Sequence, residues 1–598
     1  MRFTERLRSD ILYLRAFARA LRQVRPIDKT SARVFPALID GLAARHRDRP
    51  ALLSERETFS YRDLAGRMNR YARWTLAQDL AKGETVGLLM PNRPEYVAIW
   101  LGITRVGGVA ALLNTNLAGE RLAACIDSVA AKHVIVAAEL APQIAGAEPH
   151  LKNKPRLWIK GEGASRYPRI DIDIEGLSAA PLDGDEIRGV TLADRALYIF
   201  TAGATGLPKP AIIDHQRLMV AIAGFAGLIG ARPHDRMYDC LPLYHMLGGV
   251  LAIGPLLLRG GSVVIRNRFS PHDFWRDIRR TDCTLLQYVG DIPAALLRIP
   301  PQPEEDRHRL RLCCGAGLRP DLWREFKTRF RIPRILEFYG TTEGNVALFN
   351  IEGKEGSVGR IPWFVWRRFP TALIRFNVEK ELALRDSRGF CMRCGPGEPG
   401  ELIGAISLGK GRPVGRFAGY FDKADNEGKI LRNVFAPGDA WFRTGDLMTQ
   451  DADGYFYFID RIGDTFRWKG ENVSTTEVAR ALRSFPGVEG AIVYGVRVPD
   501  CEGRAGAATL VCPGWIDVSA LHDHLAKRLP GYARPLFVRV HRAGTEAARK
   551  LKKADLAADG FDPARTSDQL YFNDTQKKSF VPIDAGLYAR IMEGEARL

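Results

Sequence analysis

The stretch TAGATGLPKPA, from Thr201 to Ala211, stands between the apolar run ALYIF and the run AII, which begins at its last residue. Short continuous apolar runs predict buried strands. A Gly-rich turn between two strands can present backbone N–H groups to phosphate oxygens, and Lys209 adds a positive charge beside it. The stretch is not a P-loop, because the residue five positions after Gly203 is Pro208 where that motif has glycine. By itself it fits a structural turn and a phosphate loop equally.

Apolar runs alternate with longer helical patterns on both sides of this stretch. HVIVAA, GSVVI and TLLQYV have the length of strands, whereas EYVAIWLGITRVGGVAAL has helical length and spacing. This alternation predicts an α/β fold with largely parallel, buried strands. After YFYFIDRIGD the chain has its own alternation of helix and strand, in STTEVARALRSF, AIVYGVRV and VSALHDHLAKRL. We therefore expect a large domain over residues 31–460, with several layered sheets and helices, and a small α+β domain over residues 461–598.

Size, charge and cysteine content narrow the class of protein. A chain of 598 residues that is 46% hydrophobic can bury a large core and form more than one domain. The net charge of +18 favours anionic partners, but no helix-turn-helix, zinc-finger or RNP pattern supports nucleic acid. Nine cysteines spread thinly along a long chain favour a reducing compartment over a disulfide-stapled secreted domain. No GxSxG motif is present, which disfavours a serine hydrolase.

The first 30 residues predict a basic amphipathic helix that ends at Pro26. Seven arginines share residues 1–25 with two acids, and the longest apolar run is ILYL, which is too short for a signal peptide or a membrane span. Such a helix can lie in a membrane interface or dock on its own domain, and both remain open. The predicted apolar stripe consists of Phe3, Leu7, Ile11, Leu14, Phe17 and Leu21.

Five further motifs follow the glycine-rich stretch in order. They are LPLYH (241–245), CCGAGLRP (313–320), EFYGTTEGN (337–345), WFRTGDL (441–447) and DRIGDTFRWKGENVSTTEV (460–478). Together the six motifs resemble the core motifs of the adenylate-forming superfamily of acyl-CoA synthetases, luciferases and nonribosomal adenylation domains. FRWKGENVSTTEV in particular resembles the long- and very-long-chain acyl-CoA synthetases, the fatty acid transport protein family. The resemblance extends from about residue 50 to the DGFDP sequence that ends at residue 563.

The resemblance implies an ATP-dependent, AMP-forming acyl-CoA synthetase that joins a long-chain fatty acid to CoA through an acyl adenylate. ATP, Mg²⁺ and CoA would be required, and the small C-terminal domain would be a mobile lid. The cysteine content favours a cytoplasmic protein, and a water-insoluble substrate favours peripheral contact through residues 1–25 at the inner face of a membrane. A homodimer is expected by analogy with the family alone. The apolar segment Met246 to Leu258 fits either a wall of an acyl tunnel or an ordinary core segment.

The resemblance also implies roles for particular residues. Glu343 would bind Mg²⁺, and His245 would lie where the acyl group meets the α-phosphate. Asp446 would accept hydrogen bonds from the ribose hydroxyls with Arg461 donating beside it, Tyr339 would stack on adenine, and Gly315, Ala316 and Gly317 would form the wall of the adenine pocket. The full implied ATP/AMP set is Thr201, Gly203, Thr205, Gly206, Lys209, Gly315, Ala316, Gly317, Tyr339, Gly340, Thr341, Thr342, Asp446 and Arg461.

The C-terminal domain should contribute a catalytic lysine and a CoA-binding face. Counting back from ADL in GTEAARKLKKADL aligns Lys550 with the lysine of the family, although Lys552 and Lys553 lie close by. The domain would rotate between an adenylation pose, which brings in Lys550, and a thioesterification pose, with Gly463 absorbing the backbone change. The face used in the second pose would carry Lys469, Gly470, Glu471 and Asn472.

One departure from the family bears on activity. The family loop usually reads TSGTTGLPKAA, so Ala202 and Ala204 replace a serine and a threonine. A hydrogen bond to a charged group contributes about 1.5 to 3 kcal/mol, or about a tenfold to hundredfold effect for each hydroxyl that contacts phosphate. The alternative to an active ligase is therefore a weakly active or inactive family member that acts in fatty acid binding or uptake.

Overall fold

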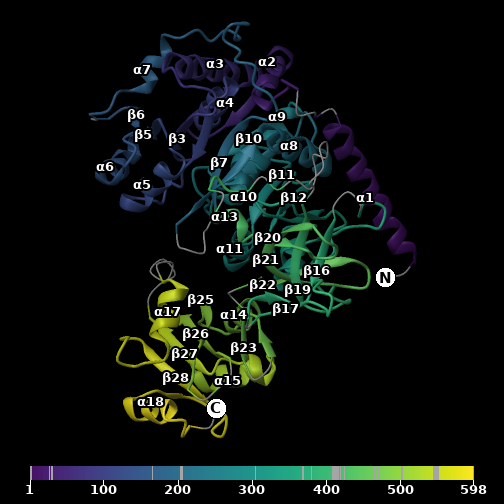
Figure 1. The fold of residues 1–598 in the computed structure, drawn as a ribbon, viewed down its shortest axis with the longest axis vertical. Helices are drawn as coiled ribbons and strands as arrows, with labels where there is room; N and C mark the ends of the chain where they lie inside the picture. Colours follow the sequence, from purple (N-terminus) through teal and green to yellow (C-terminus); the bar gives the residue numbers. More distant parts are fainter. Residues whose placement is uncertain are drawn as a thin grey trace.

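The protein consists of a large body followed by a smaller one at the C-terminus (Figure 1). The computed structural model describes residues 3–25, 27, 31–163, 166–201, 207–303, 305–366, 370–378, 380–406, 417, 419–422, 424–462, 465–468, 471–499, 501, 503–542 and 551–596. Helices and strands alternate along most of the chain, which confirms the predicted α/β class.

One sheet of the large body has six strands in the order β6-β5-β3-β4-β7-β8, all parallel except the last pair. Its strands are β3 (Thr85–Leu89), β4 (Val109–Leu112), β5 (His133–Ala137), β6 (Arg156–Lys160), β7 (Arg195–Thr201) and β8 (Lys209–Asp214). The helices of this region are α2 (Phe35–His46), α3 (Tyr61–Ala77), α4 (Pro94–Arg105), α5 (Gly119–Ser128), η1 (Ala138–Leu140), α6 (Ala141–Ala147), η2 (Glu148–His150) and α7 (Ile170–Glu175).

The second sheet of the large body has fourteen strands, in the order β16-β19-β21-β22-β15-β14-β13-β12-β11-β9-β10-β1-β2 with β20 paired to β21. The pairings from β1 through β10, β9, β11 and β12 to β13 are parallel, and those from β13 to β16 are antiparallel. Its strands are β1 (Pro50–Leu53), β2 (Thr58–Ser60), β9 (Arg236–Asp239), β10 (Ser262–Ile265), β11 (Leu285–Val289), β12 (Leu312–Ala316), β13 (Ile335–Gly340), β14 (Ala347–Asn350), β15 (Gly359–Arg360), β16 (Thr371–Ile374), β19 (Gly400–Ala405), β20 (Ile430–Arg432), β21 (Ala440–Gln450) and β22 (Tyr455–Arg461). Further elements are α8 (His215–Ile229), the π-helix η3 (Met246–Ala252), α9 (Gly254–Leu258), α10 (Phe274–Arg280), α11 (Asp291–Arg298), α12 (Pro320–Arg329), the pair β17 (Phe376–Asn377) and β18 (Leu382–Ala383), and α13 (Ala424–Glu427).

The smaller body has its own core and a five-stranded sheet in the order β25-β26-β27-β28-β29. Its core begins at Phe466, shortly after β22 ends, and the domain boundary expected at residue 461 stays a prediction. The elements are β23 (Phe466–Trp468), β24 (Glu471–Val473), α14 (Thr475–Arg483), β25 (Gly490–Val496), β26 (Ala505–Val511), α15 (Val518–Ala526), η4 (Gly531–Ala533), β27 (Phe537–His541), α17 (Lys553–Asp559), β28 (Gln569–Asp574), β29 (Ser579–Pro582) and α18 (Ala585–Met592).

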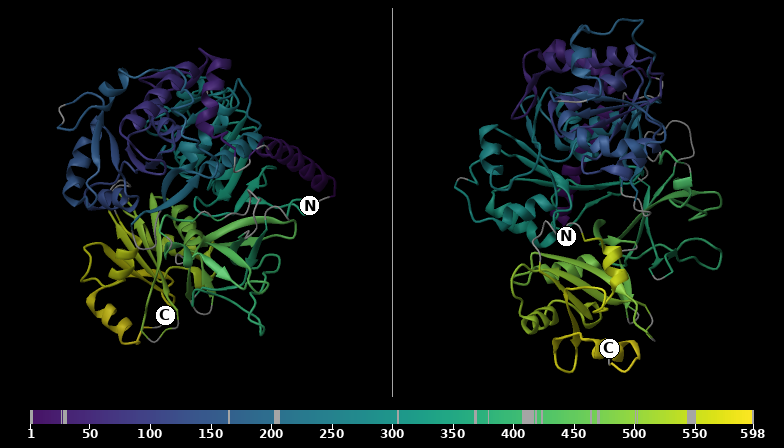
Figure 2. Two further views of the ribbon diagram at one scale, coloured as in Figure 1. Left: turned by 45° about the horizontal axis from the view of Figure 1, so that its top comes forward. Right: turned by 90° about the vertical axis from the view of Figure 1, so that its left-hand side faces the viewer.

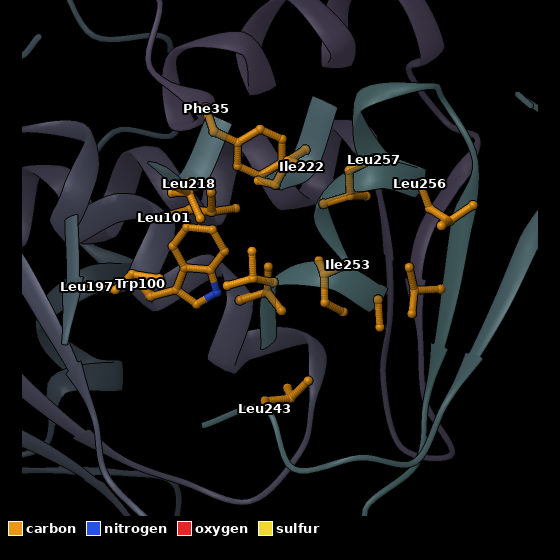
Figure 3. Close-up of a cluster of buried hydrophobic side chains, with 14 of the residues drawn as sticks. Phe35, Trp100, Leu101, Leu197, Leu218, Ile222, Leu243, Ile253, Leu256 and Leu257 are labelled. Carbon is orange, nitrogen blue, oxygen red and sulfur yellow. The ribbon is translucent and has the colours of Figure 1, made fainter. Parts of the chain in front are cut away.

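Helix α8 packs in the core of the large body with one face and lines a cavity with another. Leu218 and Ile222 point into the buried cluster that also holds Phe35, Trp100 and Leu257 (Figure 3). Helix α8 is capped by the Asp214 carboxylate, which accepts a hydrogen bond from the backbone N–H of Arg217, and it ends at a glycine in the left-handed conformation. Residues on another face of α8 line a cavity.

The N-terminal helix α1 (Phe3–Val24) docks on α8 along the outside of the large body (Figures 1 and 2). Residues 3–24 form a helix, but within the described part of the expected apolar stripe only Phe17 and Leu21 face the large body. Tyr13, Ala16 and Ala20 are buried with Phe17, whereas Leu7, Ile11 and Leu14 are exposed. No helix in the described part of the chain is long and apolar enough to cross a membrane.

Candidate active site

The residues predicted from the motifs gather where strands of the two sheets end. β7 ends at Thr201, β12 at Ala316 and β13 at Gly340. The carboxyl ends of parallel strands are the usual ligand-binding edge of α/β sheets. Gly203, Thr205 and Gly206, together with Ala202 and Ala204, lie outside the described residues, so their predicted contact with phosphate stays a prediction.

Both ends of that loop are tied to a segment that follows a distant strand. Thr201 is paired with Lys209 across the β7–β8 hairpin, and Lys209 Nζ lies 2.6 Å from Asp425 Oδ1. The Tyr420 hydroxyl donates to Glu343 Oε1 at 2.9 Å and also hydrogen-bonds with the Thr201 side chain. The structure therefore joins Thr201, at the start of the predicted loop, to the predicted Mg²⁺ ligand Glu343 through Tyr420.

Sequence reasoning missed Tyr420 and Asp425. Their segment joins the site because it adds to the edge of β8: Ile212 N–H donates to Gly419 O, and Phe421 N–H donates to Pro210 O, both at 3.0 Å. This pairing joins positions about two hundred residues apart, and no spacing within the GYFDKAD sequence signals it. Burial and the nearby Glu343 carboxylate raise the pKa of Tyr420, so its hydroxyl stays protonated as a donor.

Gly317, one of the residues predicted to wall the adenine pocket, is held by Glu337, which is 2% exposed. Its two carboxylate oxygens accept from the backbone N–H groups of Gly317 at 2.9 Å and Leu318 at 3.0 Å, and the Tyr288 hydroxyl donates to it at 2.5 Å. Burial raises the pKa of Glu337 to about 7, although these hydrogen bonds act in the opposite direction. Glu337 stood in the quoted EFYGTTEGN motif but was not assigned a role.

Gly315 has a structural reason to be glycine besides its predicted place beside adenine. A Cβ at this position would lie 2.2 Å from the carbonyl oxygen of Tyr288 on the neighbouring strand β11. No Cβ is tolerated that close to backbone, so β11 and β12 can pair here only with glycine. Gly317, at φ +91°, adopts the left-handed conformation that favours glycine.

Tyr339, Asp446 and Arg461 form one cluster, as the motifs implied. Asp446 and Arg461 are directly paired residues on β21 and β22, with Arg461 Nε 3.6 Å from Asp446 Oδ1. The Tyr339 hydroxyl, at the end of β13, donates to Asp446 Oδ2. Burial raises the pKa of Asp446, and the Tyr339 hydroxyl and the Arg461 guanidinium oppose that rise. A buried carboxylate flanked by donors suits recognition of a diol.

Arg217 is a further residue that sequence reasoning missed. Its guanidinium donates to the carbonyl oxygens of Thr341 at 3.0 Å and Thr342 at 2.6 Å, so it holds the turn after Gly340. Burial lowers the pKa of Arg217, against the attraction of Asp214 and Glu343. The sequence did mark Arg217 as unusual, because it is the only charged residue between His215 and Ile229, in a largely apolar helix.

His245 directly precedes the π-helix η3, and its exposed side chain packs edge to face on Tyr244 with ring centroids 4.6 Å apart. π-helices are rare and frequent at functional sites. Met246, Leu247 and Leu251 of this segment line an apolar cavity of about 300 Å³ that also borders Tyr339 and Thr341. Three residues of Met246 to Leu258 thus line this cavity, whereas much of the rest of the segment belongs to the core, and His245 itself is not among the lining residues.

Only some of the residues predicted for CoA binding and catalysis in the smaller body lie in the described part of the chain. Gly463, Lys469, Gly470 and Lys550 lie outside the described residues. Glu471 and Asn472 form β24, in register with Trp468 and Arg467 of β23. The roles expected for these residues in CoA binding, domain rotation and adenylation stay predictions.

Comparison with known proteins gives one family. The model of the family described as AMP-binding enzyme matches residues 40–404. "Long-chain fatty acid transport protein 1" of Mus musculus is 39% identical over 571 residues, covering 94% of this chain and 88% of the relative. The protein of the same name from Homo sapiens is 38% identical over 598 residues, covering 98% of this chain and 92% of the relative.

Solved structures share the fold. The anthranilate CoA ligase AuaEII in complex with anthranoyl-AMP has a TM-score of 0.72 at 20% identity, covering 89% of this chain and 97% of its own. ATP-bound MatB from Rhodopseudomonas palustris has a TM-score of 0.69 at 23% identity, covering 85% and 95%. O-succinylbenzoate CoA synthetase from Bacillus subtilis in complex with AMP has a TM-score of 0.68 at 24% identity, covering 87% and 97%.

Proposed function

This chain belongs to the family of AMP-binding enzymes, and from that premise we propose that it is a long-chain fatty acid–CoA ligase that works through an acyl adenylate. The resemblance predicted from the ordered motifs is confirmed, and with it an ATP-dependent, AMP-forming ligase. The fatty acid as substrate is supported by the relatives' names and by the apolar cavity beside the motif residues.

The observation that carries the proposal is the cluster of Tyr339, Asp446 and Arg461. Tyr339 and Arg461, from two strands, converge on the Asp446 carboxylate of a third, which would accept hydrogen bonds from both ribose hydroxyls. Tyr339 would present its ring to adenine while its hydroxyl orients Asp446. A nucleotide bound here would lie beside Thr341 and Thr342, whose backbone is held by Arg217.

Glu343 suits Mg²⁺ bound together with phosphate. Mg²⁺ in nucleotide sites is usually held by one or two carboxylates, phosphate oxygens and water. Glu343 is nearly buried, and the Tyr420 hydroxyl orients one of its oxygens. Within the described residues no group of three or more His, Cys, Asp and Glu side chains could hold a metal alone. When bound with ATP, the ion would supply charge neutralisation on the phosphates.

We also propose the division of labour expected from the family for the smaller body. Lys550 would neutralise charge at the α-phosphate and the fatty acid carboxylate, and the face carrying Lys469 to Asn472 would bind CoA. Asp460, at the end of β22, is tied to the smaller body, because its Oδ2 accepts from the backbone N–H and the hydroxyl of Thr475 at 2.8 Å, at the start of α14. These hydrogen bonds cross the hinge, so rotation at Gly463 would have to break them.

A weakly active or inactive family member that binds fatty acid is the second candidate. The ion pair of Lys209 with Asp425 favours it, because a lysine engaged by a carboxylate is less available to phosphate. Ala202 and Ala204 favour it for the same reason, since neither can donate a side-chain hydrogen bond. Fatty acid binding without pyrophosphate release at any chain length would identify this candidate.

Peripheral membrane contact is supported by the outer side of α1. Leu7, Ile11 and Leu14 are exposed there, and Arg8, Arg15 and Arg22 follow at steps of seven residues along an adjoining exposed stripe. Each arginine near an anionic surface contributes about 1 kcal/mol. A basic apolar stripe of this kind suits the interface of an anionic bilayer.

A short turn beside α1 extends this surface. Phe364 packs edge to face on Tyr13, and its neighbours Trp363 and Trp366 are 74% and 56% exposed. Tryptophan is enriched at membrane interfaces. We propose a cytoplasmic protein that binds the inner face of a membrane here, consistent with nine free cysteines. The homodimer stays a prediction.

Sedimentation with vesicles tests the membrane proposal. Trp363→Ala with Trp366→Ala should reduce binding to phosphatidylcholine vesicles that contain phosphatidylserine, and added salt should weaken what remains. Trp515→Ala is the matched control, because Trp515 is 77% exposed on the smaller body. Equal binding by wild type and the double variant would contradict the proposed contact.

The enzymatic proposal is tested by pyrophosphate release from ATP with palmitate, with and without CoA. We expect release that depends on palmitate, and palmitoyl-CoA when CoA is added. Asp446→Asn should lower the rate about tenfold to hundredfold, since it removes a charged acceptor. Asp185→Asn, on an exposed loop, should leave it unchanged. No release with any fatty acid from octanoate to palmitate would refute the ligase.

A further inference from the structure

The apolar cavity lies between α8, the strands β13 and β14, the π-helix η3 and α1. At one end it borders Tyr339, Thr341 and Thr342 of the nucleotide cluster. Its volume of about 300 Å³ is at the lower end of the range of ligand pockets, and its lining is predominantly apolar. An apolar cavity that begins at a nucleotide cluster is suited to an alkyl chain whose carboxylate is activated there.

One long wall is the face of α8 that turns away from the core. Arg217, Ala221, Gly224 and Leu228 recur at steps of three and four residues and all line the cavity. From Arg217 to Leu228 the helix rises about 16 Å. This wall therefore has the length needed to follow a long alkyl chain away from the activated carboxylate, and its middle is formed by the two smallest residues.

The opposite wall is α1, the helix whose role the sequence left open. Phe17, Ala20, Leu21 and Val24 line the cavity from this side, also at three- and four-residue steps. A Cβ added at Gly224 would lie 3.6 Å from Val24 Cγ2, so the two walls nearly meet at that point. Helix α1 covers the cavity from the outside of the large body.

Both halves of α1 are held against the large body. At Gly227 the two helices touch through backbone, since a Cβ there would lie 2.4 Å from Ala20 Cα, and Arg19 Nε donates to Gly227 O at 3.1 Å. Nearer its start, Asp10 Oδ1 lies 2.7 Å from a guanidinium nitrogen of Arg360, a residue that is 2% exposed. Arg360 also pairs with the buried side chain of Glu352, so Asp10 joins α1 to a charged cluster of the large body.

We infer that α1 is part of the substrate site, as the outer wall of an alkyl-chain channel whose depth is set at Gly224. This inference rests on the proposed ligase function and names the place of its acyl chain. The carboxylate would lie at the Thr341 and Thr342 end, and the chain would run along α8 past the narrow point at Gly224, on the side of β13 and β14, because α8 and α1 touch through backbone at Gly227. Side chains on both helices would then determine which chain lengths fit.

Chain-length preference in adenylate formation, measured by ATP–pyrophosphate exchange with palmitate and with octanoate, tests this inference. Gly224→Leu should lower the palmitate-to-octanoate ratio of kcat/KM about tenfold, because filling the space of two methylenes costs about that factor. Gly224→Ala adds a Cβ at ordinary contact distance and serves as the control with a nearly unchanged ratio. An unchanged ratio in a folded Gly224→Leu variant would overturn the channel.

A second pair of variants tests the α1 wall by itself. Leu21→Trp, facing the cavity, should shift the ratio toward octanoate, whereas Leu14→Trp, on the exposed side of the same helix, should not. If Gly224→Leu shifts the ratio and Leu21→Trp does not, α1 is not the wall. No exchange with either acid in wild type would instead refute the ligase function, so the two failures are distinguishable.

Discussion

Substituting alanine for Gly227 and for Gly224 makes the same chemical change at two positions of α8 with opposite expected results. The Cβ of Gly227→Ala would lie 2.4 Å from Ala20 Cα and 2.5 Å from Ala20 N, and backbone atoms cannot rotate away. The Cβ of Gly224→Ala would lie 3.6 Å from its nearest neighbour, a methyl of Val24, which is ordinary contact. Both substitutions gain about 1 kcal/mol of helix propensity, so propensity cancels between them.

The cost of Gly227→Ala falls on the docking of α1. Overpacking typically costs about 1 to 3 kcal/mol, and the separation of the helices also lengthens the hydrogen bond from Arg19 to Gly227 O. If that energy is lost from the docked state, α1 opens about fivefold to hundredfold more often. The rest of the fold should be affected less, because α8 keeps its core face toward Leu257 and Phe35.

Hydrogen exchange of the backbone amides over residues 13–24 measures this opening directly. We expect faster exchange by that factor in Gly227→Ala and unchanged or slower exchange in Gly224→Ala. Cleavage by trypsin within α1 should rise in parallel, because opening frees the backbone around its already exposed arginines for the protease. Equal protection of α1 in the two variants would refute the reasoning, since it would mean that backbone contact at Gly227 does not hold the helix.

Three other predictions concern the nucleotide site. Burial of the Glu337 charge destabilises the fold increasingly as pH rises from about 4.5 to about 7, by on the order of 3 kcal/mol. The free energy of unfolding of Glu337→Gln, measured by urea denaturation, should therefore depend less on pH over that interval than that of wild type. Parallel pH profiles would contradict the burial of this charge. Lys550→Ala should abolish adenylate formation but leave transfer from supplied acyl adenylate to CoA, and equal loss of both half-reactions would contradict its role. Ala202→Ser with Ala204→Thr should raise the adenylation rate at least tenfold in single-turnover assays if both hydroxyls contact phosphate, and no gain would show that neither does.

Much of the candidate site could be predicted because its residues stand in contiguous strand-and-turn motifs. Asp446 and Arg461 came from two such motifs, and the pairing of β21 with β22 then placed them side by side. Tyr420 was not predictable in this way. It reaches Glu343 only because its segment adds to the edge of β8, and an edge pairing between distant segments leaves no period in either sequence.

Glu337 and Arg217 show a different limit. Both were visible as polar residues in apolar surroundings, which indicates a buried partner without naming it. Only the fold showed that the Glu337 carboxylate holds the backbone of Gly317 and that Arg217 holds the carbonyl of Thr342. The residue type is visible in the sequence. The partner of its side chain depends on how two strands, or a strand and a helix, pack together in the fold.

Sequence alone predicted the α/β class, the family from six ordered motifs, and a helix at the start of the chain. The sequence did not determine which side of that helix is buried. Apolar residues lie on two sides of the helix, and on each side they recur at steps of three and four residues. Tertiary structure decided in favour of the side with Tyr13, Ala16 and Ala20. The physical reason is steric. Two helices can touch through backbone only where small residues meet, and Ala20 of α1 packs on Gly227 of α8, which is far away along the chain.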